Sequence, residues 1–303
     1  MHNFLSLFSY DFVQNAYLVG TIVAIVAAVI GYFVVLRAQA FAGEALSDIS
    51  FAGATGAAIL GISSLVGMFF FTILAALGMG ALGERIRGRD VEIGMILSFA
   101  LGLGVLFLTI YSQTGTNSTE GLQVLFGSIL TLQRSDIWMT LIAGVVILAV
   151  VAILFRPLLF ASVDPEVAET RGVPVRLLST IFLILLGITT AVTVLAVGVL
   201  LVLALLIAPP AAALRLTHRP FASIMLAVIL DVAIIWCGLS IAFIGPGSQL
   251  PVGFLVSALA AIVYFVAIPL GRLRAPRRTE PVPRADCKHK ATYISKHHTG
   301  SAG

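Results

Sequence analysis

Residues 16–36 read AYLVGTIVAIVAAVIGYFVVL, an apolar stretch that contains no charged side chain and ends at Arg37. Its length matches the roughly 20 residues that an α-helix needs to cross the hydrocarbon core of a bilayer. Long apolar runs recur along the chain, since 59% of its 303 residues are hydrophobic and only 11% are charged. Soluble globular domains are about 45–50% apolar and about 25% charged. The composition therefore predicts an integral membrane protein that crosses the bilayer many times.

Nine apolar runs predict the membrane crossings, and each must be helical because lipid offers the backbone no hydrogen-bond partner. Their expected bounds are 16–36, 46–60, 65–82, 91–111, 137–155, 177–194, 197–214, 221–243 and 253–270. The second run is short and contains Gly53 and Gly56, so we expect eight or nine crossings. The predicted fold is therefore an all-α, polytopic bundle of transmembrane helices. A further short helix at 122–132 is expected on the outer face.

The predicted transmembrane domain covers residues 1–271, and a basic tail follows at residues 272–303. The tail is rich in proline and arginine and has too little apolar content to fold alone, so we expect it to be disordered. Cys287 and the tail histidines fit no structural zinc pattern well.

The basic residues predict the orientation, because cytoplasmic loops carry an excess of lysine and arginine. With nine crossings, the arginines after the first, third, fifth, seventh and last runs all lie on one side, and the opposite loops hold only Arg134. We therefore expect an outside N-terminus and a cytoplasmic tail. Because the arginines cluster between apolar runs, the net charge of +4 does not indicate a nucleic-acid partner.

Three acidic residues stand out in or next to the apolar runs, and two of them are Glu44 and Asp48. Ionisable residues within a membrane are energetically costly and usually functional. A helix places residues four apart on one face, with Cβ atoms about 5–6 Å from each other. Two such carboxylates repel unless a cation or a proton lies between them. Oxygen ligands suit Mn²⁺ and can also serve Zn²⁺ or Fe²⁺. The pair is a candidate metal site, unless both side chains are simply solvated at the cytoplasmic interface.

Asp231 is the third of these acids and lies about ten residues into its apolar run. No second polar residue accompanies it at helical spacing. Two interpretations remain open: a buried acid hydrogen-bonded to a neighbouring helix, or a group on a translocation path.

A short cytoplasmic helix is predicted from Asp164 to Gly172, between two crossings. Asp164 is a good N-cap, and Pro165 suits the first helical position. Glu166 and Glu169 then lie near the positive end of the helix dipole, and Gly172 favours the end of the helix. An ordinary interfacial turn is the simpler alternative.

Pro209 and Pro210 are expected to interrupt or end the seventh crossing, because proline removes a backbone hydrogen bond from a helix. The small residues around them allow close helix packing. The chain has no GxxxxGK[ST] loop for ATP and no HExxH motif, so we expect no enzymatic activity of its own.

Four segments resemble the permease subunits of bacterial ABC importers for zinc, manganese and iron. They are 34–53, 125–130, 164–174 and 197–209, within a resemblance that runs from about residue 10 to residue 270. The resemblance implies a homodimer in the inner membrane, energised by a separate cytoplasmic ATPase and supplied by an external metal-binding protein. It implies no permanently bound cofactor, since the divalent cation is the transported substrate.

The resemblance also implies roles for individual residues. It places Glu44 and Asp48 on the translocation path and residues 164–172 in the groove of the ATPase. The family pattern has Asp and His where this chain has Glu44 and Asp48, so the pair here is harder and more negative. If two protomers face each other, one divalent cation neutralises half of the four charges, and we expect a bound proton as well. Carboxylate ligands favour Mn²⁺ or Fe²⁺ over Zn²⁺.

Two other functions remain open. An ion-gradient-driven secondary transporter would use Asp231 and the Glu44–Asp48 pair as a proton or cation relay. Inverted repeats would favour such a transporter, and no convincing repeat is evident in the sequence. A membrane scaffold without transport activity is the other, although it has no need of buried carboxylates.

Overall fold

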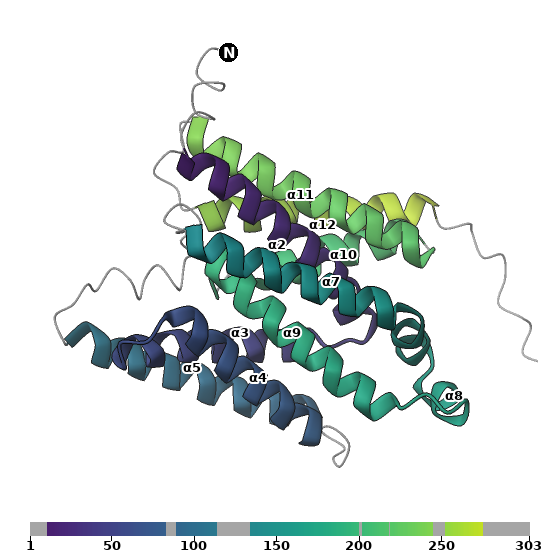
Figure 1. Ribbon diagram of the computed structural model, residues 1–303. Coiled ribbons are helices and arrows are strands. Elements are labelled where there is room, and N and C mark those ends of the chain that lie inside the picture. Colours follow the sequence, from purple (N-terminus) through teal and green to yellow (C-terminus); the bar gives the residue numbers. More distant parts are fainter. Residues whose placement is uncertain are drawn as a thin grey trace, which may run out of the picture.

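The computed structural model describes residues 11–82, 89–113, 134–199, 202–217, 219–244 and 252–274, and these ranges contain helices and no strand. Figure 1 shows long helices packed side by side, with the short helix α8 at one end of the bundle. The helices are α2 (Asp11–Leu36), α3 (Ala40–Ile59), α4 (Ser64–Leu82), α5 (Arg89–Gln113), α7 (Arg134–Val163), α8 (Pro165–Thr170), α9 (Val175–Val197), α10 (Val202–Leu216), α11 (Pro220–Ile244) and α12 (Val252–Arg274).

Seven of the described helices, all except α3, α8 and α10, are long and apolar enough to cross a membrane. Helix α10 is apolar but has only 15 residues, and the 20-residue α3 carries several polar side chains. Seven of the nine predicted runs correspond to these seven apolar helices, and the other two correspond to α3 and α10. The predicted all-α, polytopic bundle is confirmed.

Three predicted boundaries are wrong. The fifth run was expected to end at residue 155, but α7 continues to Val163 with Pro157 inside the helix. The second run begins at Ala40 rather than at residue 46, so Glu44 and Asp48 lie inside α3. The run predicted for 197–214 is divided, because α9 ends at Val197 and α10 starts at Val202. Gly198 lies between the two helices with a φ of 94°, a conformation that glycine adopts without steric cost. The predicted helix at 122–132 and the tail beyond residue 274 lie outside the described residues.

Helix α2 packs against α7, α9, α10 and α11, and together these helices form one group within the bundle (Figure 1). Its Phe33 is fully buried and meets Phe155 of α7 and Phe182 of α9 edge-on, with ring centroids 5.9 and 6.3 Å apart. Helices α3, α4 and α5 form a second group, which α9 joins to the first by packing on α3 and α4. The candidate acids of α3 therefore lie in a different helix group from Asp231 of α11.

Proline does not end α10, although the sequence left that possibility open. Pro209 and Pro210 lie inside the helix, which continues to Leu216. Pro210 has no N–H to donate to the carbonyl of Leu206, and this buried carbonyl oxygen lies against Gly31 of α2. A Cβ atom at Gly31 would overlap that oxygen and lie 2.8 Å from Cγ of Pro210. Because Gly31 has no side chain, the backbones of α2 and α10 are in contact at the point where α10 lacks a helical hydrogen bond.

Candidate functional site

Helix α3 brings Glu44 and Asp48 onto one of its faces, one turn apart. Asp48 is buried, with 7% of its surface exposed, and Glu44 is half-buried. Residues four apart on a helix have Cβ atoms about 5–6 Å from each other, which is close enough for two carboxylates to repel each other. Further along α3, the ring of Phe51 packs against Gly104 of α5.

The neighbouring positions of α3 hold the helix in place. The Ser47 hydroxyl donates a long hydrogen bond of 3.4 Å to the carbonyl of Val199, between α9 and α10. Gly53 lies against Gly67 of α4, where a Cβ atom would approach the Gly67 carbonyl oxygen to 2.6 Å. The sequence analysis did not single out Ser47 or the Gly53–Gly67 contact. In the sequence, Ser47 could have been noticed only as a hydroxyl beside the acids. The contact could have been noticed only as one glycine in each of two successive apolar runs.

The acidic pair is not a complete metal site within one chain. In the described ranges, no cluster of three or more histidine, cysteine, aspartate or glutamate side chains is present. A Mn²⁺ ion prefers about six oxygen ligands, which is more than two carboxylates supply. The pair can therefore contribute part of a coordination sphere, with the remaining ligands from another source.

Asp231 lies apart from the Glu44–Asp48 pair. It is completely buried in α11, which packs against α2, α10 and α12. Neither of its carboxyl oxygens has a hydrogen-bond partner among the described residues. The structure therefore does not supply the hydrogen bond to a neighbouring helix that the sequence left open, and it does not bring Asp231 to the acidic pair.

The short helix predicted at residues 164–172 is present as α8. Oδ1 of Asp164 accepts a hydrogen bond of 3.0 Å from the backbone N–H of Val167, which is the geometry of an N-cap. Glu166 and Glu169 are exposed, and Gly172 follows the helix with a φ of 81°. Ala168 is buried and packs α8 onto the end of the bundle. An exposed, acidic helix at this end is a suitable contact for another subunit.

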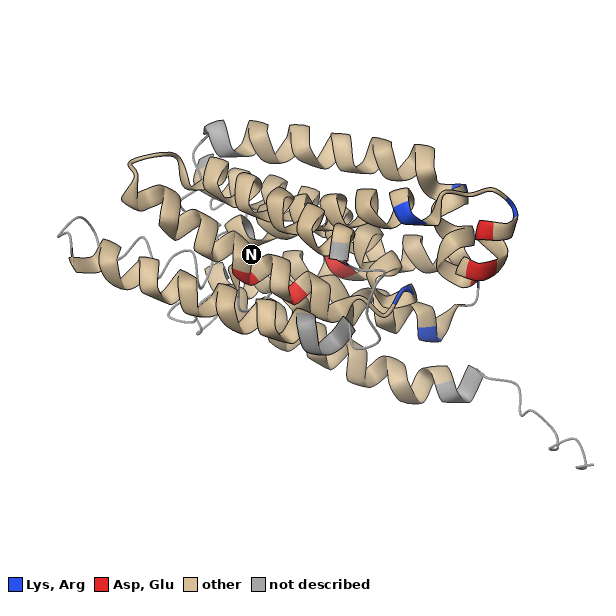
Figure 2. Cartoon of the chain, turned by 90° about the horizontal axis from the view of Figure 1, so that it is seen from below, with Lys and Arg blue, Asp and Glu red and all other residues tan. Residues whose placement is uncertain are grey.

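The charges are distributed unevenly along the bundle. In Figure 2 the described Lys and Arg positions lie toward one end of the helices, where acidic positions at the short helix α8 also lie. The remaining coloured acids lie along the bundle, away from those basic residues. This pattern agrees with the side assignment expected from the sequence, which stays a prediction.

The model of the ABC 3 transport family matches residues 9–270. The manganese transport system membrane protein MntC of Listeria innocua is 33% identical over 262 residues, which cover 86% of this chain and 91% of the relative. The manganese import system permease protein ScaB of Streptococcus parasanguinis is 32% identical over 259 residues, 85% of this chain and 90% of the relative.

A solved structure shows the same fold. A chain of PsaBC from Streptococcus pneumoniae, in complex with Fab, superposes with a TM-score of 0.77 at 29% sequence identity. The match covers 86% of this chain and 92% of the solved chain. The resemblance to permeases of metal ABC importers is thereby confirmed, and all four sequence segments that carried it lie within the matched residues. The chain belongs to the ABC 3 transport family.

Proposed function

We propose that this chain is the membrane-spanning permease subunit of an importer that moves a divalent transition-metal cation, with manganese as the first candidate. The Glu44–Asp48 pair on α3 carries this proposal, because it holds two hard oxygen donors within an apolar helix bundle. Carboxylate oxygens suit Mn²⁺ better than they suit Zn²⁺. The names of the relatives MntC and ScaB, which both refer to manganese, support the same assignment.

A second copy of the chain would complete the site. Two facing α3 helices bring four carboxylates together, which is closer to the ligand number of Mn²⁺ than one pair is. One divalent cation offsets half of the four negative charges, and a bound proton reduces the remainder. The homodimer thus explains why one chain contributes only a pair of acids.

A separate ATPase subunit would drive the transport. Helix α8 is the docking element in this proposal, since its exposed Glu166 and Glu169 lie at the end of the bundle where the basic residues gather. ATP binding would draw the two α8 helices together, and α7 and α9, which flank α8, would transmit the movement to the bundle. This end is then cytoplasmic, and an external metal-binding protein delivers the cation to the opposite end. The chain itself hydrolyses no ATP.

Metal uptake by the assembled transporter tests the site. We expect Glu44→Gln and Asp48→Asn each to reduce manganese uptake about tenfold or more, because each removes a charged ligand. Glu44→Asp and Asp48→Glu keep the charge and serve as matched controls that retain part of the uptake. Unchanged uptake by both amide variants, with the complex assembled, would show that the metal passes elsewhere.

Dependence on the ATPase separates this proposal from a secondary transporter. We expect uptake to stop when the co-expressed ATPase carries a substitution that prevents ATP hydrolysis. A protonophore should have no effect at constant ATP. Uptake that continues without ATP hydrolysis and stops with the protonophore would favour the ion-gradient mechanism instead.

A further inference from the structure

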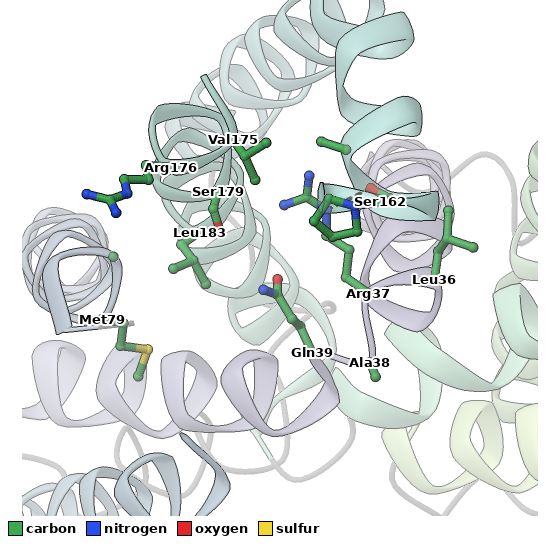
Figure 3. A pocket seen from close by; sticks show the side chains of 13 residues that line it. Leu36, Arg37, Ala38, Gln39, Met79, Ser162, Val175, Arg176, Ser179 and Leu183 are labelled. Carbon is green, nitrogen blue, oxygen red and sulfur yellow. Dashed lines mark hydrogen bonds between the residues drawn. The ribbon is translucent and has the colours of Figure 1, made fainter. Parts of the chain in front are cut away.

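A second site, unrelated to the acidic pair in its chemistry, lies at the base of α8. It is a cavity of about 380 Å³ between the α2–α3 turn, the end of α7 and the first turns of α9 (Figure 3). Its polar lining residues are Arg37, Gln39, Ser162, Arg176 and Ser179. None of the described residues that line it is acidic. The cavity therefore presents donors and positive charge, which is the opposite of a cation site.

Two helices begin at this cavity. Gln39 is the N-cap of the 20-residue α3, and Pro174 is the N-cap of the 23-residue α9, whose first turn contributes Val175 and Arg176 to the lining. Neither helix has a side-chain hydrogen bond at its N-cap. The first-turn N–H groups of a helix and its positive dipole end attract anions. The N–H of Val175, the first residue of α9, already donates to the carbonyl of Val173, so the remaining first-turn N–H groups of the two helices are the ones an anion could use.

The side chain of Gln39 is an independent sign of an occupant. Only 8% of its surface is exposed, and its Oε1 atom has no hydrogen-bond partner in the described part of the chain. Figure 3 shows its amide directed into the space between Arg37 and Ser179. A half-turn of the amide exchanges its oxygen and nitrogen, so Gln39 can present N–H donors to an anion. A buried polar group without a partner is costly. Because Oε1 is an acceptor, a bound anion is satisfied only in the turned orientation, in which the amide N–H groups donate to it.

Arg37 is fixed at the wall of the cavity. Its Nε donates a hydrogen bond of 2.7 Å to Oγ of Ser162, and its guanidinium lies 4.9 Å from the ring centre of Phe182. The charge is thus held in position before any ligand arrives. Arg176 stands at the rim, with its guanidinium directed away from Gln39 in Figure 3. The neighbouring acid Asp164 does not line the cavity and instead caps α8.

We propose that this cavity binds a phosphate group, carried either by the headgroup of an acidic phospholipid or by a free phosphate anion. The guanidinium of Arg37, the hydroxyl of Ser179, the amide of Gln39 and the N-terminal turns of two helices are all groups that bind phosphate, whereas the Ser162 hydroxyl already donates to the carbonyl of Leu158. The cavity also has apolar lining residues, which suit the glycerol and first methylenes of a lipid: Leu36, Met79, Val175 and Leu183. The bound group would connect the start of α3, which carries the acidic pair, to α8 and α9.

The test uses the full-length protein in nanodiscs of phosphatidylcholine, with or without phosphatidylglycerol, and native mass spectrometry to count retained lipids. The variants are Arg37→Gln, Gln39→Leu and Ser179→Ala. The control is Arg219→Gln, which removes an exposed charge outside the cavity. We expect each cavity variant to retain phosphatidylglycerol about tenfold less well than the unmodified protein, and the control to match the unmodified protein.

Inorganic phosphate, added to nanodiscs of phosphatidylcholine alone, distinguishes the two sources. If phosphate raises the melting temperature and the cavity variants lose that rise, the occupant is a free anion. If only phosphatidylglycerol has this effect, the occupant is a lipid. The proposal is overturned if neither probe binds, or if Arg219→Gln weakens binding as much as the cavity variants do. Because Gln39→Leu and Ser179→Ala leave Arg37 and its contacts in place, a folding defect of Arg37→Gln does not prevent the test.

Discussion

Gly31 of α2 lies in direct backbone contact with Leu206 of α10, at the carbonyl that Pro210 leaves without a helical donor. We expect Gly31→Ala to destabilise the protein by about 1–3 kcal/mol, the usual cost of overpacking a close contact. A thermal unfolding series in detergent measures the difference. Gly102→Ala in α5 is the matched control, because no atom lies within 4 Å of a Cβ built there. Equal stability of the two variants would show that the helices can separate at no cost.

Replacing Asp48 by histidine should change the metal preference of the acidic pair. Imidazole is a softer ligand than carboxylate and suits Zn²⁺. We expect Asp48→His to bind zinc several-fold more tightly relative to manganese than the unmodified protein does. Competition between the two metals at the purified permease, without a delivering protein, gives the ratio. A ratio that does not move would mean that Asp48 does not contact the metal.

Asp231→Asn should leave transport nearly unchanged. The residue is completely buried, neither oxygen has a partner in the described ranges, and its helix is separate from the acidic pair. The amide has the same shape and no charge to bury, so we expect uptake within about twofold of the unmodified protein and stability at least as high. Uptake and melting temperature are measured together. A loss of uptake in a stable variant would put Asp231 on the transport path.

The cap of α8 should matter for the partner subunit. We expect Asp164→Ala to cost about 1 kcal/mol of local helix stability, because the N–H of Val167 loses its acceptor. Retention of the ATPase during purification should fall in proportion. Asp164→Ser keeps a capping oxygen and should retain the ATPase. If both variants retain it equally, α8 is not the docking element.

The sequence predicted the helices well where one physical signal dominated. Long apolar runs predicted α2 and α11, because lipid imposes the same requirement on every spanning segment. Asp164 and Pro165 predicted the start of α8, because a cap depends only on its own residues. The start of α3 was placed six residues late, since the polar positions around Glu44 interrupt the apolar run although the helix continues through them.

Features that depend on distant parts of the chain were not predictable. Helix α10 continues past Pro209, and its Leu206 and Pro210 lie against Gly31, which is far away in sequence. The cavity at the base of α8 is lined by residues from several separate helices. Nothing in the sequence therefore indicates that Gln39 and Ser179 lie close together. The Glu44–Asp48 pair was recognised from its spacing, but spacing does not reveal how many ligands surround it.

The polarity of α3 has a consequence for biogenesis. A segment with two acids and two serines within seven residues partitions poorly into lipid, and α3 is absent from the helices that are apolar enough to span alone. The translocon would therefore release α2 and α4 into the bilayer readily and retain α3 until its neighbours arrive. The Gly53–Gly67 contact with α4 and the cover provided by α5 become available only after those helices are synthesised. Insertion of α3 should then be complete only once about the first 113 residues have left the ribosome.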